Sequence, residues 1–384
     1  MPQNLRVPGP TPLPGAVREA QAAPMINHRG PEFAELLFDV TDRLRRLLAT
    51  RAEILVLTGS GTGALEAAVV NTLSPGDRVL AATIGEFGDR FAAIAETFGA
   101  RVTRLTSERG HSTDPTELEA ALATTSEPYR AVLLTHNETS TGVYNDIQTL
   151  ARVVHAAPGD PLVLVDGISG LGAMPFDVDG WGIDLVVTAS QKAWMASPGI
   201  AMAVLGDRAR AASETAQMPR FYWDFREARR WSGEAQTPWT PAVSVLYGLR
   251  VGLDRIEAEG RERTWARHEA IANATRSGLE ALGLRLVAAP AHRSNTVTAA
   301  WLPEGVAWSE LSAQARAAGL VLAGGQGALK GRILRIGHMG EVTLEDIVSA
   351  LAVLQPLLPA GGATGDPAER ARDAYESTLA VAVG

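Results

Sequence analysis

The chain has 384 residues and a formal net charge of −8, with 46% hydrophobic and 20% charged residues. Two domains are expected, because this length exceeds the size at which single cores usually stop growing. The sequence has no basic patch of the kind that binds nucleic acid, and no apolar run is long enough to span a membrane. The absence of cysteine excludes disulfides, thiolate metal sites and cysteine nucleophiles. The N-terminus lacks the apolar core of a secretory signal, so we expect a cytoplasmic protein.

The first thirty residues form a predicted N-terminal arm. Its prolines at 2, 8, 10, 12, 14 and 24 exclude a long helix, and a disordered, solvated tail is the simplest interpretation. His28 and Arg29 add cationic side chains at the end of the arm. Pro31 fits the first turn of a helix, and apolar residues recur at helical spacing from Phe33 to Leu48.

The first cluster of glycines lies between a predicted strand at 54–57 and a predicted helix at 64–70. Residues 58–63 read Thr-Gly-Ser-Gly-Thr-Gly. Glycines let a backbone approach an anion closely, and the free N–H groups at the start of a helix face it. The spacing matches neither a dinucleotide fingerprint nor a P-loop. A plain tight turn is the alternative to a phosphate site, whose candidate residues are Ser60, Gly61 and Thr62.

Further strands are predicted at 78–82, 100–105 and 131–134. Phe87 lies where Gly-Glu-Phe-Gly opens another helix, and by itself it would be assigned to the core. The last of these strands runs into the polar sequence Thr-His-Asn-Glu-Thr-Ser-Thr-Gly, which is a poor candidate for a mere connection. Its His136 is either a ligand-facing or a structural residue. A metal site is not indicated, because no second histidine or acid lies at ligand spacing from His136.

Two short apolar runs, at 162–166 and 184–189, are typical of buried strands. The first ends in Asp166, and the second leads into Ser190, Gln191 and Lys192. The carboxyl ends of parallel strands form the edge of a sheet at which ligands bind. An acid and a lysine at one crevice suit a cofactor that needs a Schiff-base amine and an anionic partner for its ring nitrogen, which is pyridoxal 5′-phosphate.

The pattern changes after residue 205. Aromatic residues gather over 221–231 without clear periodicity, and an interface, a substrate wall and core packing are all compatible with them. Thr240 and Pro241 fit the cap and first turn of a helix at 242–259. A helix at 263–282 and strands at 295–301 and 320–322, with a helix between them, predict a smaller C-terminal α/β domain. The expected divisions are an arm at 1–30, a large domain at 31–260 and a small domain at 261–384.

A strand predicted at 332–340 contains the candidate substrate-binding residue. Alternation places Arg335 on the face opposite Leu334 and Ile336. An inward arginine is costly without an anionic partner, and a substrate carboxylate can supply one through a bidentate pair. Arg332 is a weaker competitor for this role, and His338 is more often structural.

The motifs from Val7-Pro8-Gly9-Pro10-Thr11 to Leu334-Arg335-Ile336-Gly337 resemble those of the class V, fold-type I, pyridoxal-phosphate-dependent aminotransferases. The resemblance is to the alanine–glyoxylate and serine–pyruvate branch and covers nearly the whole chain. It implies an α/β fold, with a mainly parallel sheet of the seven-stranded type in the large domain. The order of the motifs makes the match specific, because Ser-Gln-Lys alone is common.

The resemblance also implies roles for individual residues. Lys192 holds the cofactor and moves the substrate proton, while Phe87 stacks on the ring and Thr139, or Ser140, lies near its phenolic oxygen. Thr237 and Thr240 reach the phosphate of the neighbouring subunit. The implied cofactor-binding residues are Ser60, Gly61, Thr62, Phe87, Thr139, Asp166, Gln191, Lys192, Thr237 and Thr240. The implied substrate-binding residues are Arg335, His28 and Arg29.

The implied reaction is transamination of serine or alanine with glyoxylate or pyruvate, in a homodimer with shared active sites. Ureidoglycine–glyoxylate and aminoethylphosphonate–pyruvate transaminases use the same scaffold and stay open as alternatives. A phosphonate would need further cations, for which His28, Arg29 and Arg332 are available. Some relatives are described as hydrogenase-associated subunits, but the complete set of Lys192, Asp166 and Arg335 argues for an enzyme. We expect neither nucleic acid nor a membrane as partner.

Overall fold

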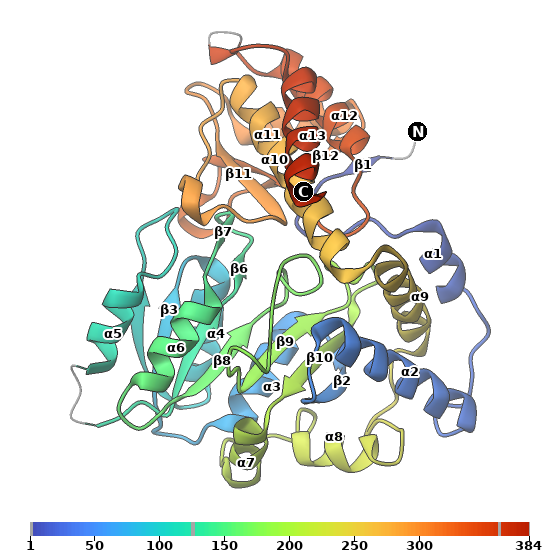
Figure 1. Ribbon diagram of the computed structural model, residues 1–384, viewed down its shortest axis with the longest axis vertical. Coiled ribbons are helices and arrows are strands. Elements are labelled where there is room, and N and C mark those ends of the chain that lie inside the picture. Colours follow the sequence, from blue (N-terminus) through green and yellow to red (C-terminus); the bar gives the residue numbers. More distant parts are fainter. Residues whose placement is uncertain (1–2, 124–126, 360–361, 384) are drawn as a thin grey trace.

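The computed structural model describes residues 3–123, 127–359 and 362–383. Figure 1 shows a large unit built around a central sheet and a smaller unit, formed mostly by the C-terminal part of the chain, above it. Residues 1–2 and 384, at the ends of the predicted arm and small domain, lie outside the described residues.

The central sheet has seven strands in the order β2-β10-β9-β8-β5-β3-β4. The four neighbouring pairs from β9 to β4 are parallel, whereas β10 runs antiparallel to both β2 and β9. The prediction of a mainly parallel sheet is therefore confirmed. The strands are β2 (Glu53–Gly59), β3 (Arg78–Thr83), β4 (Arg101–Thr106), β5 (Ala131–Thr135), β8 (Leu162–Asp166), β9 (Leu185–Ala189) and β10 (Gly199–Leu205).

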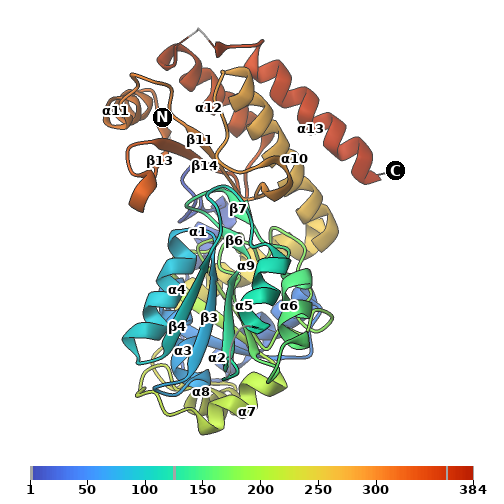
Figure 2. The ribbon, with the colours of Figure 1, turned by 90° about the vertical axis from the view of Figure 1, so that its left-hand side faces the viewer.

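Helices cover both faces of this sheet, as Figure 2 shows. In β8, Val163 and Val165 point into the apolar core under one helical layer, and Leu162 and Leu164 point into the core under the other. This alternation explains why all five residues of β8 are buried. One layer contains α2 (Pro31–Leu48), α6 (Ile147–Ala156) and α9 (Val243–Glu259), and the other contains α3 (Gly61–Thr72), α4 (Glu86–Thr97) and α7 (Asp207–Thr215). Helices α5 (Pro115–Ala123) and α8 (Phe225–Ser232) complete the large unit.

The smaller unit has its own apolar core, which includes Leu279, Leu334 and Leu351. Its antiparallel sheet has the order β11-β14-β13. Gly260, at φ +90°, separates α9 from α10. Its elements are α10 (Arg261–Ala281), β11 (Val297–Trp301), α11 (Trp308–Ala317), β12 (Leu320–Val321), β13 (Ala323–Gly324), β14 (Ile333–Gly337), α12 (Leu344–Leu354) and α13 (Pro367–Val383).

The N-terminal residues 3–30 are docked on the rest of the chain, so the interpretation as a solvated tail is wrong. Strand β1 (Asn4–Leu5) pairs in parallel with β12, and helix α1 (Gly15–Gln21) packs against α9. The strand expected at 332–340 is also shorter than predicted, since β14 ends at Gly337, whose N–H turns to the carbonyl of Arg6. In the described part of the chain, no helix is both long and apolar enough to cross a membrane.

Candidate active site

Asp166 and Lys192 lie at the carboxyl ends of the adjacent parallel strands β8 and β9, as the sequence predicts. Asp166 is the last residue of β8, is 4% exposed, and accepts the N–H of Ile168 at 2.9 Å. Lys192 lies in the turn after β9, and its Nζ donates to the carbonyl of Pro8 at 2.5 Å. The acid and the amine therefore share one buried edge of the sheet.

Burial shifts both groups toward neutrality. Desolvation raises the pKa of Asp166 to about 7, although the hydrogen bond from Ile168 and the charge of Lys192 oppose the shift. Desolvation lowers the pKa of Lys192 to about 8, with Asp166 opposing that shift and Arg335 adding to it. An amine with this pKa is about 10% neutral, and so nucleophilic, near pH 7, far more than a free lysine.

A cavity of roughly 140 Å³ lies beside this pair. It brings together eight of the predicted cofactor-binding residues from five separate parts of the chain. These are Ser60, Gly61, Thr62, Phe87, Thr139, Asp166, Gln191 and Lys192. The remaining lining residues are Leu65, Arg90, Asn137, Ile168 and Ser169.

The glycine-rich turn that follows β2 caps helix α3. The side chain of Ser60, the N-cap residue, accepts the N–H of Gly63 at 3.5 Å, so the first turn of α3 faces the cavity. The glycines also serve packing inside the protein. A Cβ on Gly59 or Gly63 would come within 2.5 or 2.6 Å of the Trp223 ring, and one on Gly61 within 2.7 Å of Ile168. Close approach to an anion is thus not the only reason for glycine here.

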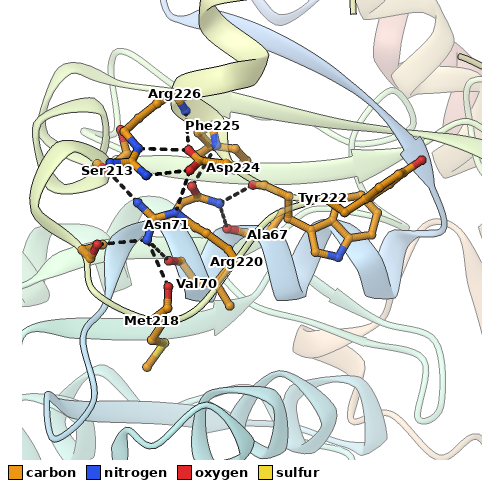
Figure 3. A network of polar contacts seen from close by, with 12 residues as sticks. Ala67, Val70, Asn71, Ser213, Met218, Arg220, Tyr222, Asp224, Phe225 and Arg226 are labelled. Atoms are coloured by element: carbon orange, nitrogen blue, oxygen red, sulfur yellow. Dashed lines mark hydrogen bonds and ion pairs between the residues drawn. The ribbon is translucent and has the colours of Figure 1, made fainter. Parts of the chain in front are cut away.

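Trp223 packs against Gly59 and Gly63, and the polar network around Asn71, Arg220 and Asp224, which Figure 3 shows, holds the segment that carries it. The Asn71 amide donates to the carbonyls of Ala67 and Trp223, and its oxygen accepts the N–H of Phe225. Arg220, which forms an ion pair with Asp224 at 3.7 Å, ties the segment to neighbouring helix ends. Its guanidinium donates to the carbonyls of Val70, Ser213, Ala216 and Met218. Part of the aromatic segment therefore packs behind the glycine turn.

Phe87 is positioned by Glu138, a carboxylate that the sequence interpretation overlooked. Glu138 is fully buried, and its Oε2 accepts the N–H groups of Phe87 at 2.9 Å and Gly88 at 3.2 Å. Its Oε1 accepts the N–H of Ser140 at 2.9 Å. Burial raises the pKa of Glu138, while these hydrogen bonds oppose the shift. The buried acid thus caps the helix that places Phe87 in the cavity.

Arg335 lies beside the cavity rather than among its lining residues. It is 6% exposed, and its Nε donates to the carbonyl of Gly324 at 2.8 Å. Its Nη1 donates to the carbonyl of Thr139, also at 2.8 Å. The predicted inward orientation is therefore present, with a guanidinium fixed by two carbonyls between the two units.

Four predicted site residues lie elsewhere in the chain. The Arg29 guanidinium stacks on Trp231 at 4.2 Å and donates to the side chain of Gln236 and to the carbonyl of Thr237. The hydroxyl of Thr237 donates to the carbonyl of Trp239. None of His28, Arg29, Thr237 or Thr240 lines the cavity of this single chain.

The residues that sequence reasoning missed share a recognisable position. Arg90 follows Phe87 by nearly one helical turn, and its guanidinium lies 4.7 Å from the Phe87 ring and 3.4 Å from the Thr62 hydroxyl. Ile168 and Ser169 lie two and three residues after Asp166. Spacing from a recognised residue could have identified all three. Within the described ranges, no group of three or more histidine, aspartate or glutamate side chains could hold a metal ion.

The donor set fits pyridoxal phosphate. The N–H groups at the start of α3 suit a phosphate, and Asp166 suits a protonated ring nitrogen. The buried Oε1 of Gln191 has no hydrogen-bond partner among the described residues, so a ligand group can supply one. Lys192 offers a buried amine of lowered pKa for covalent attachment.

The family model described as aminotransferase class-V matches residues 17–343. The chain belongs to this family. It is 38% identical over 362 residues to a protein named soluble hydrogenase, small subunit, from Synechococcus sp. (strain PCC 6716), covering 94% of each chain. It is 36% identical to the L-aspartate–glyoxylate aminotransferase of Paracoccus denitrificans (strain Pd 1222), covering 98% of this chain and 97% of that one. The crystal structure of an alanine–glyoxylate aminotransferase from Nostoc sp. is similar with a TM-score of 0.88 and 29% identity, covering 93% of this chain and 95% of that one.

These matches establish the enzyme class. The protein is a class V aminotransferase with the fold-type I architecture, and this family depends on pyridoxal phosphate. The chain has only two lysines, Lys192 and Lys330, among 35 basic residues, and Lys330 is exposed. Of the two lysines, only Lys192 is partly buried.

Replacing Glu138 by glutamine should destabilise the protein by about 1–3 kcal/mol. Both carboxylate oxygens of Glu138 accept backbone N–H groups, one from Phe87 and the other from Ser140. Whichever way the glutamine amide is turned, its NH₂ group would therefore face one of these N–H donors. Urea denaturation of the cofactor-free protein measures this change. The exposed Glu119→Gln on α5 is the control and should stay within about 0.5 kcal/mol. Equal stability of Glu138→Gln and the parent protein would mean that Glu138 is already protonated.

Asp166→Asn should change how stability depends on pH. The pKa of Asp166 is about 7 in the folded protein, above the value near 4 of an unfolded aspartate. Its stabilising contribution is therefore complete at low pH and is lost as pH rises through 7. Between about pH 4 and pH 7, the cofactor-free parent should lose unfolding free energy relative to Asp166→Asn. Parallel curves for the parent and Asp166→Asn would contradict this prediction.

Proposed function

We propose that the protein transfers an amino group from a small neutral amino acid, serine or alanine, to a 2-oxo acid, glyoxylate or pyruvate. The observation that supports this most strongly is the buried pair of Lys192 and Asp166 beside the glycine turn of α3. The similarity to an enzyme named alanine–glyoxylate aminotransferase supports the choice of substrates. A cytoplasmic location stays a prediction from the sequence.

Each residue of the site has a definite task in this reaction. Pyridoxal phosphate, when bound, supplies an aldehyde that links to amines and a ring that withdraws electrons from the substrate α-carbon. Lys192 would hold the cofactor and, as a free amine, take the α-proton and return it on the cofactor side. Asp166 would keep the ring nitrogen protonated. Arg335 would bind the substrate carboxylate and thereby orient the bond that breaks.

An aspartate donor is the second candidate, because Arg90 adds another cation to the cavity and a relative is named L-aspartate–glyoxylate aminotransferase. A distal carboxylate would need a guanidinium on the substrate side of the site. Arg90 instead contacts the hydroxyl of Thr62 in the predicted phosphate cradle. This position favours a role toward the cofactor phosphate and, with it, a neutral donor.

A non-catalytic role has the support of the relative named as a hydrogenase subunit. Such a scaffold would not need a buried amine whose pKa is lowered to about 8. Nor would it need a buried acid beside that amine, since desolvating both groups is unfavourable. The complete pair therefore favours catalysis.

We further propose a homodimer in which each chain completes the site of the other. Large apolar side chains are exposed at Met25, Phe38, Phe221 and Tyr222, and Phe221 and Tyr222 both stack on Trp239. Thr237 and Thr240 flank this aromatic group in the sequence, and Arg29 holds the turn that carries them. In this dimer, Thr237 and Thr240 would reach the partner's phosphate, and His28 and Arg29 would line its substrate side.

Lys192→Ala should lower transaminase activity by on the order of 10²–10⁴-fold, because the proton carrier is lost. The purified parent protein with pyridoxal phosphate should show a visible absorbance band that borohydride removes, with the added mass on Lys192. The control is Lys330→Ala, which removes the only other lysine and should keep both activity and band. A colourless parent protein without activity on serine, alanine or aspartate would favour the scaffold role.

Arg90→Gln should weaken binding of pyridoxal phosphate by about 10–100-fold, since a hydrogen bond to a charged group is lost. It should leave the ratio of kcat/KM for alanine to that for aspartate unchanged. The exposed Arg152→Gln on α6 is the control and should change neither quantity. A selective fall in kcat/KM for aspartate would instead assign Arg90 to a distal carboxylate and overturn the neutral-donor proposal.

A further inference from the structure

Residues 4–11 form a segment, here named the strap, that joins the small unit to the turn holding Lys192. At its start, β1 pairs with β12, and the Arg6 N–H donates to the carbonyl of Val321 at 2.8 Å. The Arg6 carbonyl then accepts the N–H of Gly337 at 2.8 Å. Gly337 is two residues beyond Arg335 on the same strand, β14.

The other end of the strap is bonded to the lysine turn itself. The N–H of Thr11 donates to the carbonyl of Gln191 at 3.1 Å, and its hydroxyl donates to the carbonyl of Lys192 at 3.2 Å. Between these two anchors, the carbonyl of Pro8 accepts Lys192 Nζ at 2.5 Å. The strap thus contacts both the backbone and the amine of Lys192.

The fit leaves no room for a side chain at two points of contact. A Cβ on Gly9 would lie 2.5 Å from Lys192 Nζ and 2.9 Å from its Cε. A Cβ on Gly337 would lie 2.2 Å from the carbonyl oxygen of Val7. The strap therefore passes in contact between the strand of Arg335 on one side and the lysine amine on the other.

We propose that the strap is a positioning segment for Lys192, in which the Pro8 carbonyl holds the amine whenever it is not linked to the cofactor. In each half-reaction the amine must leave the cofactor, stay near the substrate α-carbon and return. A fixed hydrogen-bond acceptor limits the positions that the free amine can take. Because the strap is also bonded to β14, it fixes the position of the Lys192 amine relative to Arg335, the proposed carboxylate-binding residue. This proposal rests on the proposed function.

The two-lysine composition allows a direct test on the cofactor-free protein. Labelling lysine with ¹³C and ¹⁵N gives two side-chain signals, from Lys192 and from the exposed Lys330, which serves as internal reference. Gly9→Ala should shift the Lys192 signal and leave that of Lys330 in place. Gly305→Ala is the matched control, because Gly305 also has positive φ, at +80°, but nothing lies within 4 Å of its Cβ position. It should move neither signal.

In the cofactor-loaded enzyme, Gly9→Ala should lower kcat about 100-fold, since a displacement near 1 Å can have that effect. KM for the amino donor should change little, because the carboxylate still meets Arg335. A folded Gly9→Ala protein with an unmoved Lys192 signal overturns the proposal. So does an equal loss in Gly305→Ala.

Thr11→Val is a second variant in case Gly9→Ala does not fold. It keeps the backbone and shape of the strap and removes only the hydroxyl that donates to Lys192. The Lys192 signal should again shift, and an unchanged signal counts against the strap. Because the spectra are recorded without cofactor or substrate, a parent protein inactive on every amino donor would refute the proposed function and leave this test of the strap intact.

Discussion

The structure depends on the burial of an acid and an amine at one edge of a sheet. Asp166 and Lys192 are both withdrawn from water, and desolvation disfavours the charged form of each. Their pKa values move toward each other, to about 7 and about 8, although free aspartate and lysine differ by more than six units. Near neutral pH, small changes in the surroundings therefore decide where protons reside, which suits a site that moves them.

The buried polar loop after β5 connects this pair to the rest of the protein. Glu138 caps the helix of Phe87, and the carbonyl of Thr139 holds Arg335. The Asn137 side chain bonds to Ser169, in the turn after Asp166, and to Ser294 and Thr296 in the small unit. The positions of Phe87 and Arg335 and the contact between the units thus depend on three consecutive residues. Buried polar groups are tolerated here because they satisfy one another.

Much of the fold follows from patterns that are local in sequence. The buried runs ending at Asp166 and Ala189 predict parallel strands, and the rule for their carboxyl ends brings Asp166 and Lys192 together. The direction of β10 cannot be read in this way, because its run of small apolar residues suits either orientation. Local patterns also cannot predict contacts between side chains that are far apart in the sequence. Glu138 meets Phe87 some fifty residues away, and Pro8 meets Lys192 across 184 positions.

The glycines at 59, 61 and 63 show how a sequence motif can give an incomplete reason for the residues it contains. The sequence motif indicated an anion cradle, whereas the rings and methyl groups of Trp223 and Ile168 account for the small residues by packing alone. Lysine usage points more firmly to chemistry. With 33 of its 35 cations supplied by arginine, the chain uses the residue that stays charged wherever a cation suffices. Lys192 is the only one of the two lysines that is partly buried, and the property that distinguishes a lysine from an arginine is the ability to lose a proton.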